Sequence, residues 1–105
     1  MVFSKSYCPH CKATKELLTG ILKDDKFSKV RMDVVELDKF PDSETGNQIK
    51  AYLTHKTGQS TVPNIFIDGQ HLGGNSDLQA KHQEGALEEW LLGSLDDNYD
   101  DAEEL

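Results

Sequence analysis

Two cysteines separated by two residues carry the strongest chemical signal in this sequence of 105 residues. Cys8 and Cys11 are its only cysteines and enclose Pro9 and His10. A pair at this spacing is typical either of a redox-active dithiol or of half a metal site. A structural zinc site needs two further ligands, and no second cysteine pair exists. We therefore expect redox chemistry here, with zinc or iron–sulfur binding as the alternatives.

Cys8 is the expected nucleophile of the pair. Pro9 favours the first position of a helix, which makes Cys8 the N-cap residue. Unpaired N–H groups and the helix dipole at that end favour a thiolate, and Lys5 adds positive charge nearby. Thiols in such settings have pKa values of about 3.5 to 7.5, against about 8.5 for a free thiol. Cys11 lies one turn further along and is expected to resolve a mixed disulfide on Cys8, while His10 can donate a hydrogen bond or titrate near neutral pH.

A second candidate segment is Thr61-Val62-Pro63, which precedes an expected strand. A proline at the first residue of a strand is allowed at a turn or sheet edge, and this is the simpler interpretation. With a cis bond before Pro63, the backbone N–H and C=O of Val62 would face outward. An extended peptide could then pair with them as an added strand.

A third candidate segment is Gly73-Gly74-Asn75-Ser76-Asp77. Glycines allow a ligand close to the backbone, and a helix that opens at Ser76 offers free N–H groups to a carboxylate. Asp77 could bind an ammonium group, so the segment suits the α-end of an amino acid. A turn followed by an ordinary capped helix is the alternative.

The elements that must position these segments follow from hydrophobic spacing and turn residues. We expect a strand over residues 1–5, a helix from Pro9, a strand over 30–34, and a helix capped by Asp42 or Ser43 and ended by Gly58. The apolar faces of the two helices comprise Leu17, Leu18, Ile21 and Leu22, and Ile49, Tyr52 and Leu53.

The second half of the chain is expected to contain a hairpin and two helices. Strands over 64–67 and 70–72 flank Asp68-Gly69, a strong hairpin signal. A capping box from Ser76 to Gln79 opens a short helix, and Leu87, Trp90 and Leu91 mark a last helix closed by Gly93. A βαβ unit followed by a hairpin predicts an α/β fold with a four-stranded mixed sheet flanked by helices.

Charge and composition exclude several classes of protein. The formal net charge is −8, which argues against nonspecific nucleic-acid binding. No apolar run approaches the roughly 20 residues of a membrane span, and no signal peptide is visible, so we expect a cytoplasmic protein. Six acids and no base fall between Asp96 and Leu105. We expect one domain over residues 1–95 and an acidic, disordered tail over 96–105.

Taken together, the three segments resemble a dithiol glutaredoxin of the thioredoxin superfamily. The resemblance runs from about Val2 to Leu92 and rests on the order and separation of the motifs. It implies a thioredoxin-like fold, a cis bond before Pro63, and a glutathione site. The implied glutathione-binding residues are Lys5, Tyr7, His10, Thr61, Val62, Pro63, Gly74, Ser76 and Asp77, with Cys8 and Cys11 catalytic and no metal.

The sequence departs from that family in a few places. Relatives most often have tyrosine at the position of His10, and some have glutamine at Lys50 and a basic residue at Ser60. Relatives also begin with a helix before the first strand, which this chain lacks.

The resemblance implies a glutathione-dependent thiol–disulfide oxidoreductase. A monothiol route through Cys8 would reduce protein–glutathione mixed disulfides, and a dithiol route through Cys8 and Cys11 would reduce protein disulfides. Glutathione would be the co-substrate and thiol proteins the partners, without nucleic acid or membrane, and the protein would be a monomer. The alternative is a dimeric carrier or sensor that holds a [2Fe–2S] cluster through Cys8 and glutathione, although Pro9 is unusual in such members.

Overall fold

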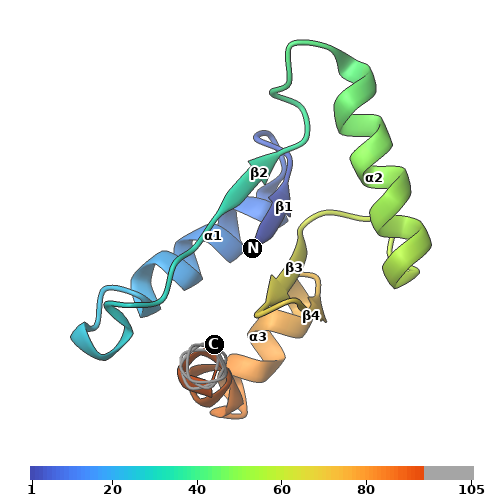
Figure 1. Cartoon of the computed structure of the whole chain (residues 1–105). Helices are drawn as coiled ribbons and strands as arrows, with labels where there is room; N and C mark the ends of the chain where they lie inside the picture. The colour runs from blue at the N-terminus through green and yellow to red at the C-terminus, as the bar shows by residue number, and fades with distance from the viewer. Residues whose placement is uncertain (94–105) are drawn as a thin grey trace, which may run out of the picture.

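The computed structural model describes residues 1–93, which are organised around one sheet (Figure 1). The elements in chain order are β1 (Val2–Ser4), α1 (Pro9–Ile21), the 3-10 helix η1 (Asp25–Phe27), β2 (Val34–Glu36), α2 (Ser43–Thr57), β3 (Asn64–Ile67), β4 (Gln70–Gly73) and α3 (Asn75–Gln83). Residues 86–93 are also helical. In this part of the chain no helix has the length and apolar character to cross a membrane. The predicted tail at 96–105 lies outside the described residues.

The sheet has the strand order β2-β1-β3-β4. β1 and β2 are parallel, with Val2 opposite Val34 and Ser4 opposite Glu36. The β1–β3 and β3–β4 pairs are antiparallel. The predicted mixed sheet, built from a βαβ unit and a hairpin, is therefore confirmed.

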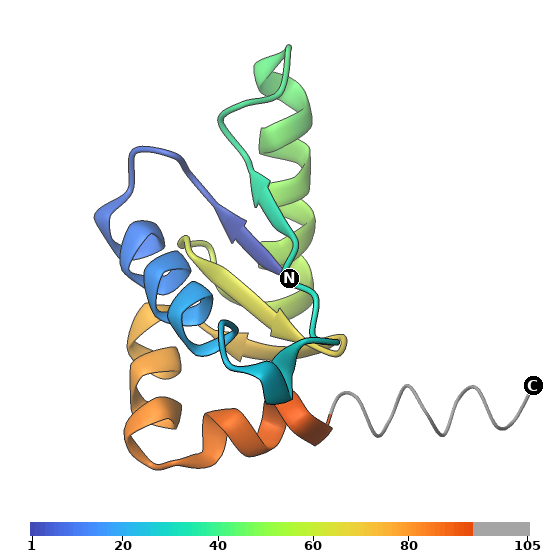
Figure 2. The same cartoon turned by 90° about the vertical axis from the view of Figure 1, so that its left-hand side faces the viewer.

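The main core lies between the sheet and one layer of helices. Figure 2 shows α1, α3 and the helical residues 86–93 on one face of the sheet, and α2 on the other. The buried residues of this core cluster are Val2, Leu18, Phe27, Ile65, Ile67, Leu78, Leu87 and Leu91. Trp90 packs against the cluster while partly exposed, so the last helix has the predicted apolar face.

The second strand begins later than its alternating pattern predicted. β2 covers Val34–Glu36 rather than residues 30–34. β1 is only three residues long, and Val34 is the first residue to pair with it. Val30 and Met32 still pack against the core cluster from outside the ladder. The alternation therefore predicted the packing of Val30 and Met32 but not that of Val34, which is exposed, and strand pairing decided where the strand starts.

The ends of α2 follow the predicted capping chemistry. The Asp42 carboxylate accepts a hydrogen bond from the Thr45 N–H at 2.7 Å, as an N-cap residue does. Gly58 ends the helix at φ 77°, a left-handed conformation that suits glycine. The predicted apolar face was partly wrong, because Tyr52 is 61% exposed. Gly46 and Leu53 are the buried residues of α2.

The hairpin turn is formed by Asp68 and Gly69, as predicted. Their φ values are 51° and 76°, so both central residues adopt the left-handed conformation that a type I′ turn requires. Phe66 on β3 then packs edge-on against Phe3 of β1, with ring centroids 5.9 Å apart. This aromatic pair covers the sheet face opposite the main core.

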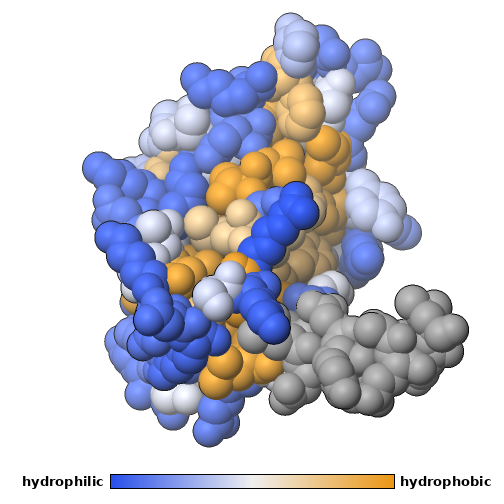
Figure 3. Space-filling view, turned by 60° about the vertical axis from the view of Figure 1, so that its left-hand side comes forward, coloured by the Kyte–Doolittle hydropathy of each residue, from blue (hydrophilic) through white to orange (hydrophobic). Residues whose placement is uncertain are grey.

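Apolar surface is exposed around the first residue. Figure 3 shows a band of hydrophobic side chains between hydrophilic margins on this side of the molecule. Two hollows of the structure share Met1 and Phe66 in their linings. Cys8 and Cys11 line neither hollow, so the site described below is separate from this surface.

Candidate active site

Cys8 occupies the N-cap position of α1, where the chain turns from β1 into the helix. Its backbone is extended (φ −87°, ψ 122°), and Pro9 follows at the first helical position. The Cys8 N–H donates to the Lys5 carbonyl at 3.1 Å, and the Cys8 carbonyl accepts from the Lys12 N–H at 3.0 Å. The first bond closes the loop before Cys8, and the second begins α1. The sulfur lies partly exposed at the helix N-terminus.

The surroundings of Cys8 favour its thiolate. Burial alone would raise the pKa of this thiol. Hydrogen bonds from the N–H and thiol of Cys11, a hydrogen bond from the His10 N–H and the charge of Lys5 outweigh that effect. The pKa of Cys8 is therefore below the ordinary value of a thiol, as an attacking sulfur near neutral pH requires.

Cys11 is the buried member of the pair, at 0% exposure. Burial raises the pKa of its thiol, and a negative charge on Cys8 raises it further. The Lys5 N–H, 3.5 Å from the sulfur, and the Ser4 hydroxyl lower it, but by less. The two sulfurs are thus set apart as one accessible thiolate and one protected thiol.

Alkylation of the reduced protein should report this difference. We expect iodoacetamide to modify Cys8 with a rate midpoint below pH 8.5, the approximate value for a free thiol, because only the thiolate reacts. In denaturant the same cysteine should titrate near that value. Peptide mass spectrometry identifies the modified residue, and identical midpoints in the folded and unfolded chains would contradict the assignment.

The Thr61-Val62-Pro63 segment faces Cys8 across the site. Its Val62–Pro63 peptide bond is cis, as the resemblance implied. The Val62 carbonyl lies 4.0 Å from Cys8 Sγ. Gln59 braces the segment, since its side-chain amide donates to the carbonyls of Thr61 at 3.0 Å and Pro63 at 2.9 Å.

Two adjoining grooves share Thr61 and Val62, and Cys8 lines the first of them. One, of about 320 Å³, is lined by Lys5, Tyr7, Cys8, Lys50, Ser60, Thr61 and Val62. The other, of about 400 Å³, is lined by His10, Thr61, Val62, Pro63, Gly74, Asn75 and Ser76. Volumes of this order suit a small organic ligand, and the pair would accommodate an extended one across Val62.

The start of α3 differs from the predicted capping box. Gly74, not Ser76, is the N-cap residue, and the helix begins at Asn75. The Asp77 carboxylate reaches back to accept the Gly74 N–H at 2.9 Å. Gly73 precedes it at φ 127°, and a Cβ there would overlap that carboxylate. Close packing of the two glycines under Asp77 therefore sets the helix start, which the Ser-x-x-Gln pattern alone did not indicate.

The loop before Cys8 is held by Asp38, which follows β2 in the chain. The Asp38 carboxylate accepts hydrogen bonds from the Ser6 hydroxyl and, at 2.9 Å, from the Ser6 N–H. These bonds hold the pKa of Asp38 below its usual range. Because β1 and β2 are parallel, the residues after both strands meet at one edge of the sheet. This contact ties the Lys5–Tyr7 loop to the end of β2.

Comparisons with known proteins agree with this geometry. The model of the glutaredoxin family matches residues 1–72. Glutaredoxin-1 of Rhizophagus irregularis is 47% identical over 91 residues, which are 87% of this chain and 80% of that protein. The chain belongs to the glutaredoxin family. Glutaredoxin-2 of Schizosaccharomyces pombe is 46% identical, over 92% of this chain and 78% of that protein.

Solved glutaredoxins share the fold. A crystal structure of a buckwheat glutaredoxin–glutathione complex superposes with a TM-score of 0.76 at 38% identity, covering 89% of this chain and 76% of that one. The thioredoxin-like fold expected of a glutaredoxin is confirmed. The chain is accordingly a glutaredoxin-type enzyme, a glutathione-dependent thiol oxidoreductase.

Most of the residues expected at a glutaredoxin glutathione site border the two grooves. Asp77 is the exception, because it lines neither groove and instead holds the Gly74 N–H. The grooves add Lys50, Ser60 and Asn75 to the predicted set. Among residues 1–93, no three His, Cys, Asp or Glu side chains are grouped closely enough to hold a metal ion.

Gln59 and Asp38 were missed from the sequence. Each supports a loop of the site rather than lining it. Asp38 has a positional signal, because it follows a strand parallel to β1 and so reaches the same sheet edge as Lys5. Gln59 has only its proximity to Pro63 in the chain, and nothing in its residue type indicates that its amide turns toward two carbonyls.

Proposed function

We propose that this glutaredoxin reduces protein–glutathione mixed disulfides through Cys8 alone and protein disulfides through Cys8 and Cys11. One observation supports both routes: an accessible cysteine with a lowered pKa lines the first of two adjoining grooves, and a buried cysteine with a raised pKa lies one turn behind it. The partners are glutathione, glutathionylated proteins and proteins with disulfides. The protein acts as a monomer, and its cytoplasmic location stays a prediction.

Glutathione is proposed to lie extended across Val62. The Val62 N–H has no hydrogen-bond partner among the described residues, so a tripeptide backbone can pair with it. The ammonium groups of Lys5 and Lys50, in the first groove, suit the glycyl carboxylate. Gly74 and Ser76 border the second groove, where the N-terminus of α3 suits the γ-glutamyl carboxylate. Asp77 lies in the first turn of that helix, outside the groove lining, and its negative charge would attract the γ-glutamyl ammonium.

The monothiol route uses only the accessible sulfur. The Cys8 thiolate attacks the glutathione sulfur of a protein–SSG disulfide, forms a Cys8–SG disulfide and releases the protein thiolate. A second glutathione thiolate then attacks the glutathione sulfur of that adduct. Glutathione disulfide is formed and the Cys8 thiolate is restored, so two glutathione equivalents leave as one oxidised molecule.

The dithiol route recruits the buried sulfur. Cys8 attacks a protein disulfide, releases one thiolate and stays linked to the other sulfur. Cys11 loses its proton and attacks Cys8 Sγ, which releases the second substrate sulfur and leaves a Cys8–Cys11 disulfide. Two electrons pass to the substrate, and glutathione supplies them again when it reduces the enzyme.

A coupled assay tests the two routes separately. With glutathione, glutathione reductase and NADPH, we expect turnover of a glutathionylated peptide by both the native protein and Cys11→Ser. A protein disulfide substrate should be turned over only by the native protein, because Cys11→Ser cannot resolve the adduct. Absence of turnover of the glutathionylated peptide by the native protein would overturn the proposal.

The iron–sulfur alternative would use the same Cys8 and has a distinct readout. Anaerobic reconstitution with iron, sulfide and glutathione should leave the protein colourless and monomeric on a sizing column. A stable brown dimer without reductase activity would favour the cluster role instead.

A further inference from the structure

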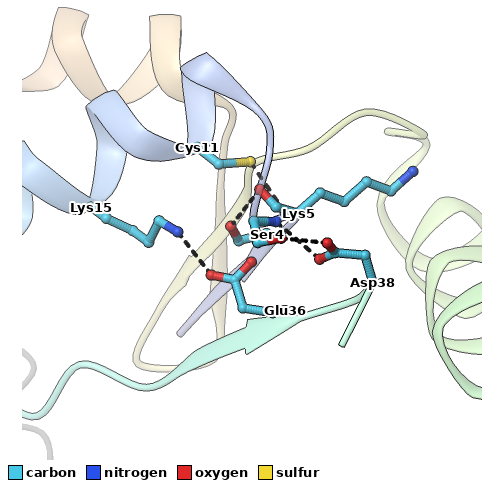
Figure 4. Close-up of polar contacts among 7 residues, drawn as sticks. Ser4, Lys5, Cys11, Lys15, Glu36 and Asp38 are labelled. Atoms are coloured by element: carbon cyan, nitrogen blue, oxygen red, sulfur yellow. Dashed lines mark hydrogen bonds and ion pairs between the residues drawn. The ribbon is translucent and has the colours of Figure 1, made fainter. Parts of the chain in front are cut away.

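A charged pair lies one helical turn behind Cys11, between α1 and the sheet (Figure 4). Lys15 follows Cys11 at the i+4 position and so lies on the same helix face. Its ammonium donates to Glu36 Oε1 on β2 at 2.8 Å, and the two side chains are only 28% and 23% exposed. Neither residue is used in the two routes above.

Strand register brings this pair next to the buried thiol. Ser4 and Glu36 are direct partners across β1 and β2, and the Leu37 N–H closes the ladder on the Ser4 carbonyl at 2.8 Å. Ser4 is fully buried, and its hydroxyl donates to the Lys5 carbonyl at 3.4 Å while lying close enough to the Cys11 sulfur to lower the pKa of that thiol. Cys11 therefore lies over Ser4, and Lys15 lies over the neighbouring Glu36.

One oxygen of this arrangement is left without a partner. Glu36 Oε2 is buried and is the one such side-chain oxygen or nitrogen in residues 1–93 without a hydrogen bond. A buried carboxylate oxygen of this kind is costly, and buried polar atoms are normally paired. In Figure 4 this oxygen points away from Lys15 and toward Ser4. It is an open acceptor directed toward the neighbourhood of Cys11.

The other charged groups near Cys11 do not offer an acceptor. The ammonium of Lys5 extends toward the ring of Tyr7, 6.0 Å from its centroid. Both Asp38 oxygens are engaged by Ser6 at the exposed edge. Cys8 is bound to substrate at the step in question, so its sulfur is no longer a base.

The ion pair of Lys15 and Glu36 also supplies the positive charge that ionisation of the Cys11 thiol needs. Lys15 has a raised pKa, foremost because of its hydrogen bond to Glu36, and the charges of Glu36, Cys11 and Asp38 add to this. The positive charge of this ammonium and a negative charge on Cys11 therefore favour each other. The resolving thiol, whose burial opposes ionisation, thus has both a cation to stabilise its charged form and a carboxylate to take its proton.

We propose that Glu36, held in place by Lys15, accepts the proton of the Cys11 thiol when Cys11 attacks the mixed disulfide on Cys8. For this step the Ser4 hydroxyl turns away from the Lys5 carbonyl, takes up the proton of Cys11 and gives its own proton to Glu36 Oε2. The sulfur–sulfur bond between Cys8 and Cys11 forms as the bond between Cys8 and the substrate sulfur breaks. The substrate leaves as a thiolate and takes up the proton as Glu36 returns to its charged form. This inference rests on the dithiol route proposed above.

Glu36→Gln tests the proposal, with Glu16→Gln as the matched control. Glu16 is an exposed residue on α1, and its replacement removes the same charge. Reduced protein is mixed rapidly with glutathione disulfide and quenched with acid. Mass spectrometry then follows formation of the Cys8–glutathione adduct and its conversion to the Cys8–Cys11 disulfide. We expect unchanged adduct formation in both variants and, near neutral pH, about 100-fold slower conversion in Glu36→Gln.

The pH profile separates proton transfer from a structural effect. In the native protein the conversion rate should depend weakly on pH near neutrality. In Glu36→Gln it should rise by about tenfold per pH unit, since only pre-formed thiolate then reacts. Removing the carboxylate also leaves Lys15 unpaired, which by charge alone would favour the thiolate and speed the step. A slower variant therefore reports the lost acceptor.

Three results are decisive. Conversion in Glu36→Gln with the rate and pH profile of Glu16→Gln would overturn the inference while leaving the proposed function intact. Failure of the native protein to form a Cys8–glutathione adduct would overturn both. Should Glu36→Gln not fold, Glu36→Asp retains a carboxylate and should keep the weak pH dependence at a lower rate. A steep profile in Glu36→Asp would count against the inference.

Discussion

Replacement of Cys8 by serine is expected to abolish both reductase routes. The sulfur of Cys8 is the group that attacks substrate in each, and a serine hydroxyl stays protonated in the same surroundings. We expect turnover of a glutathionylated peptide and of a protein disulfide to fall by at least about 10⁴-fold, the scale on which loss of a nucleophile acts. The coupled NADPH assay measures both.

Cys11→Ser is the matched control, because it makes the same atomic change one turn along α1. It should retain the monothiol route, so a loss in Cys8→Ser alone assigns attack to that sulfur. Cys8 is partly exposed, and its replacement should leave the circular dichroism spectrum and thermal midpoint close to native. Glutathione-dependent turnover by a folded Cys8→Ser protein would refute the assignment.

Gly46→Ala is expected to destabilise the fold more than any other single methyl addition to a described glycine. Gly46 is buried in α2, where a Cβ would overlap the carbonyl oxygen of Leu37. That carbonyl is backbone, and the Leu37 N–H is bonded to Ser4, so it cannot move aside cheaply. We expect the free energy of unfolding to fall by about 2 kcal/mol or more, and the thermal midpoint by roughly 10 °C.

Gly20→Ala is expected to stabilise the protein. Gly20 lies in α1 with open space around the position of a Cβ. Alanine there should raise the free energy of unfolding by about 0.5–1 kcal/mol, because it removes conformational freedom from the unfolded chain. Urea unfolding of the two variants beside the native protein gives both values. Stabilisation by both alanines would mean that α2 does not pack against Leu37 as described.

The two variants also separate helix propensity from tertiary packing. Both replace glycine by alanine within a helix, so local propensity predicts a gain for each. Only the approach of α2 to the end of β2 makes them differ. This approach also lets Lys50 on α2 border the same groove as Lys5 and Cys8, so a shift of α2 in Gly46→Ala should weaken glutathione-dependent turnover as well.

Several local features were predictable because their causes lie within a few residues. The Asp68-Gly69 turn follows from two residues that tolerate positive φ. Asp42 and Gly58 end α2 by backbone hydrogen bonding that needs no distant partner. The position of Cys8 at the start of α1 follows from Pro9 in the same way. The redox character of the site was therefore already present in the order of residues.

Other features depend on which segments meet in space. β2 starts at Val34 because three residues of β1 are available to pair with it. Gly74 caps α3 because Asp77 folds back over two glycines. The alternating pattern marked Val30 and Met32 as core-facing but not the exposure of Val34. The Ser-x-x-Gln pattern marked a helix but not the residue at which it starts.

The sequence by itself determined the reactive pair, its helix, the hairpin and the family resemblance. The tertiary structure decided that Val62 lies beside Cys8 and that Glu36 lies behind Cys11 through Ser4. The reason is physical: caps and turns are settled by bonds between near neighbours in the chain. The polarity around a sulfur atom depends instead on tertiary packing and strand register, which decide which groups lie within a few ångströms of it.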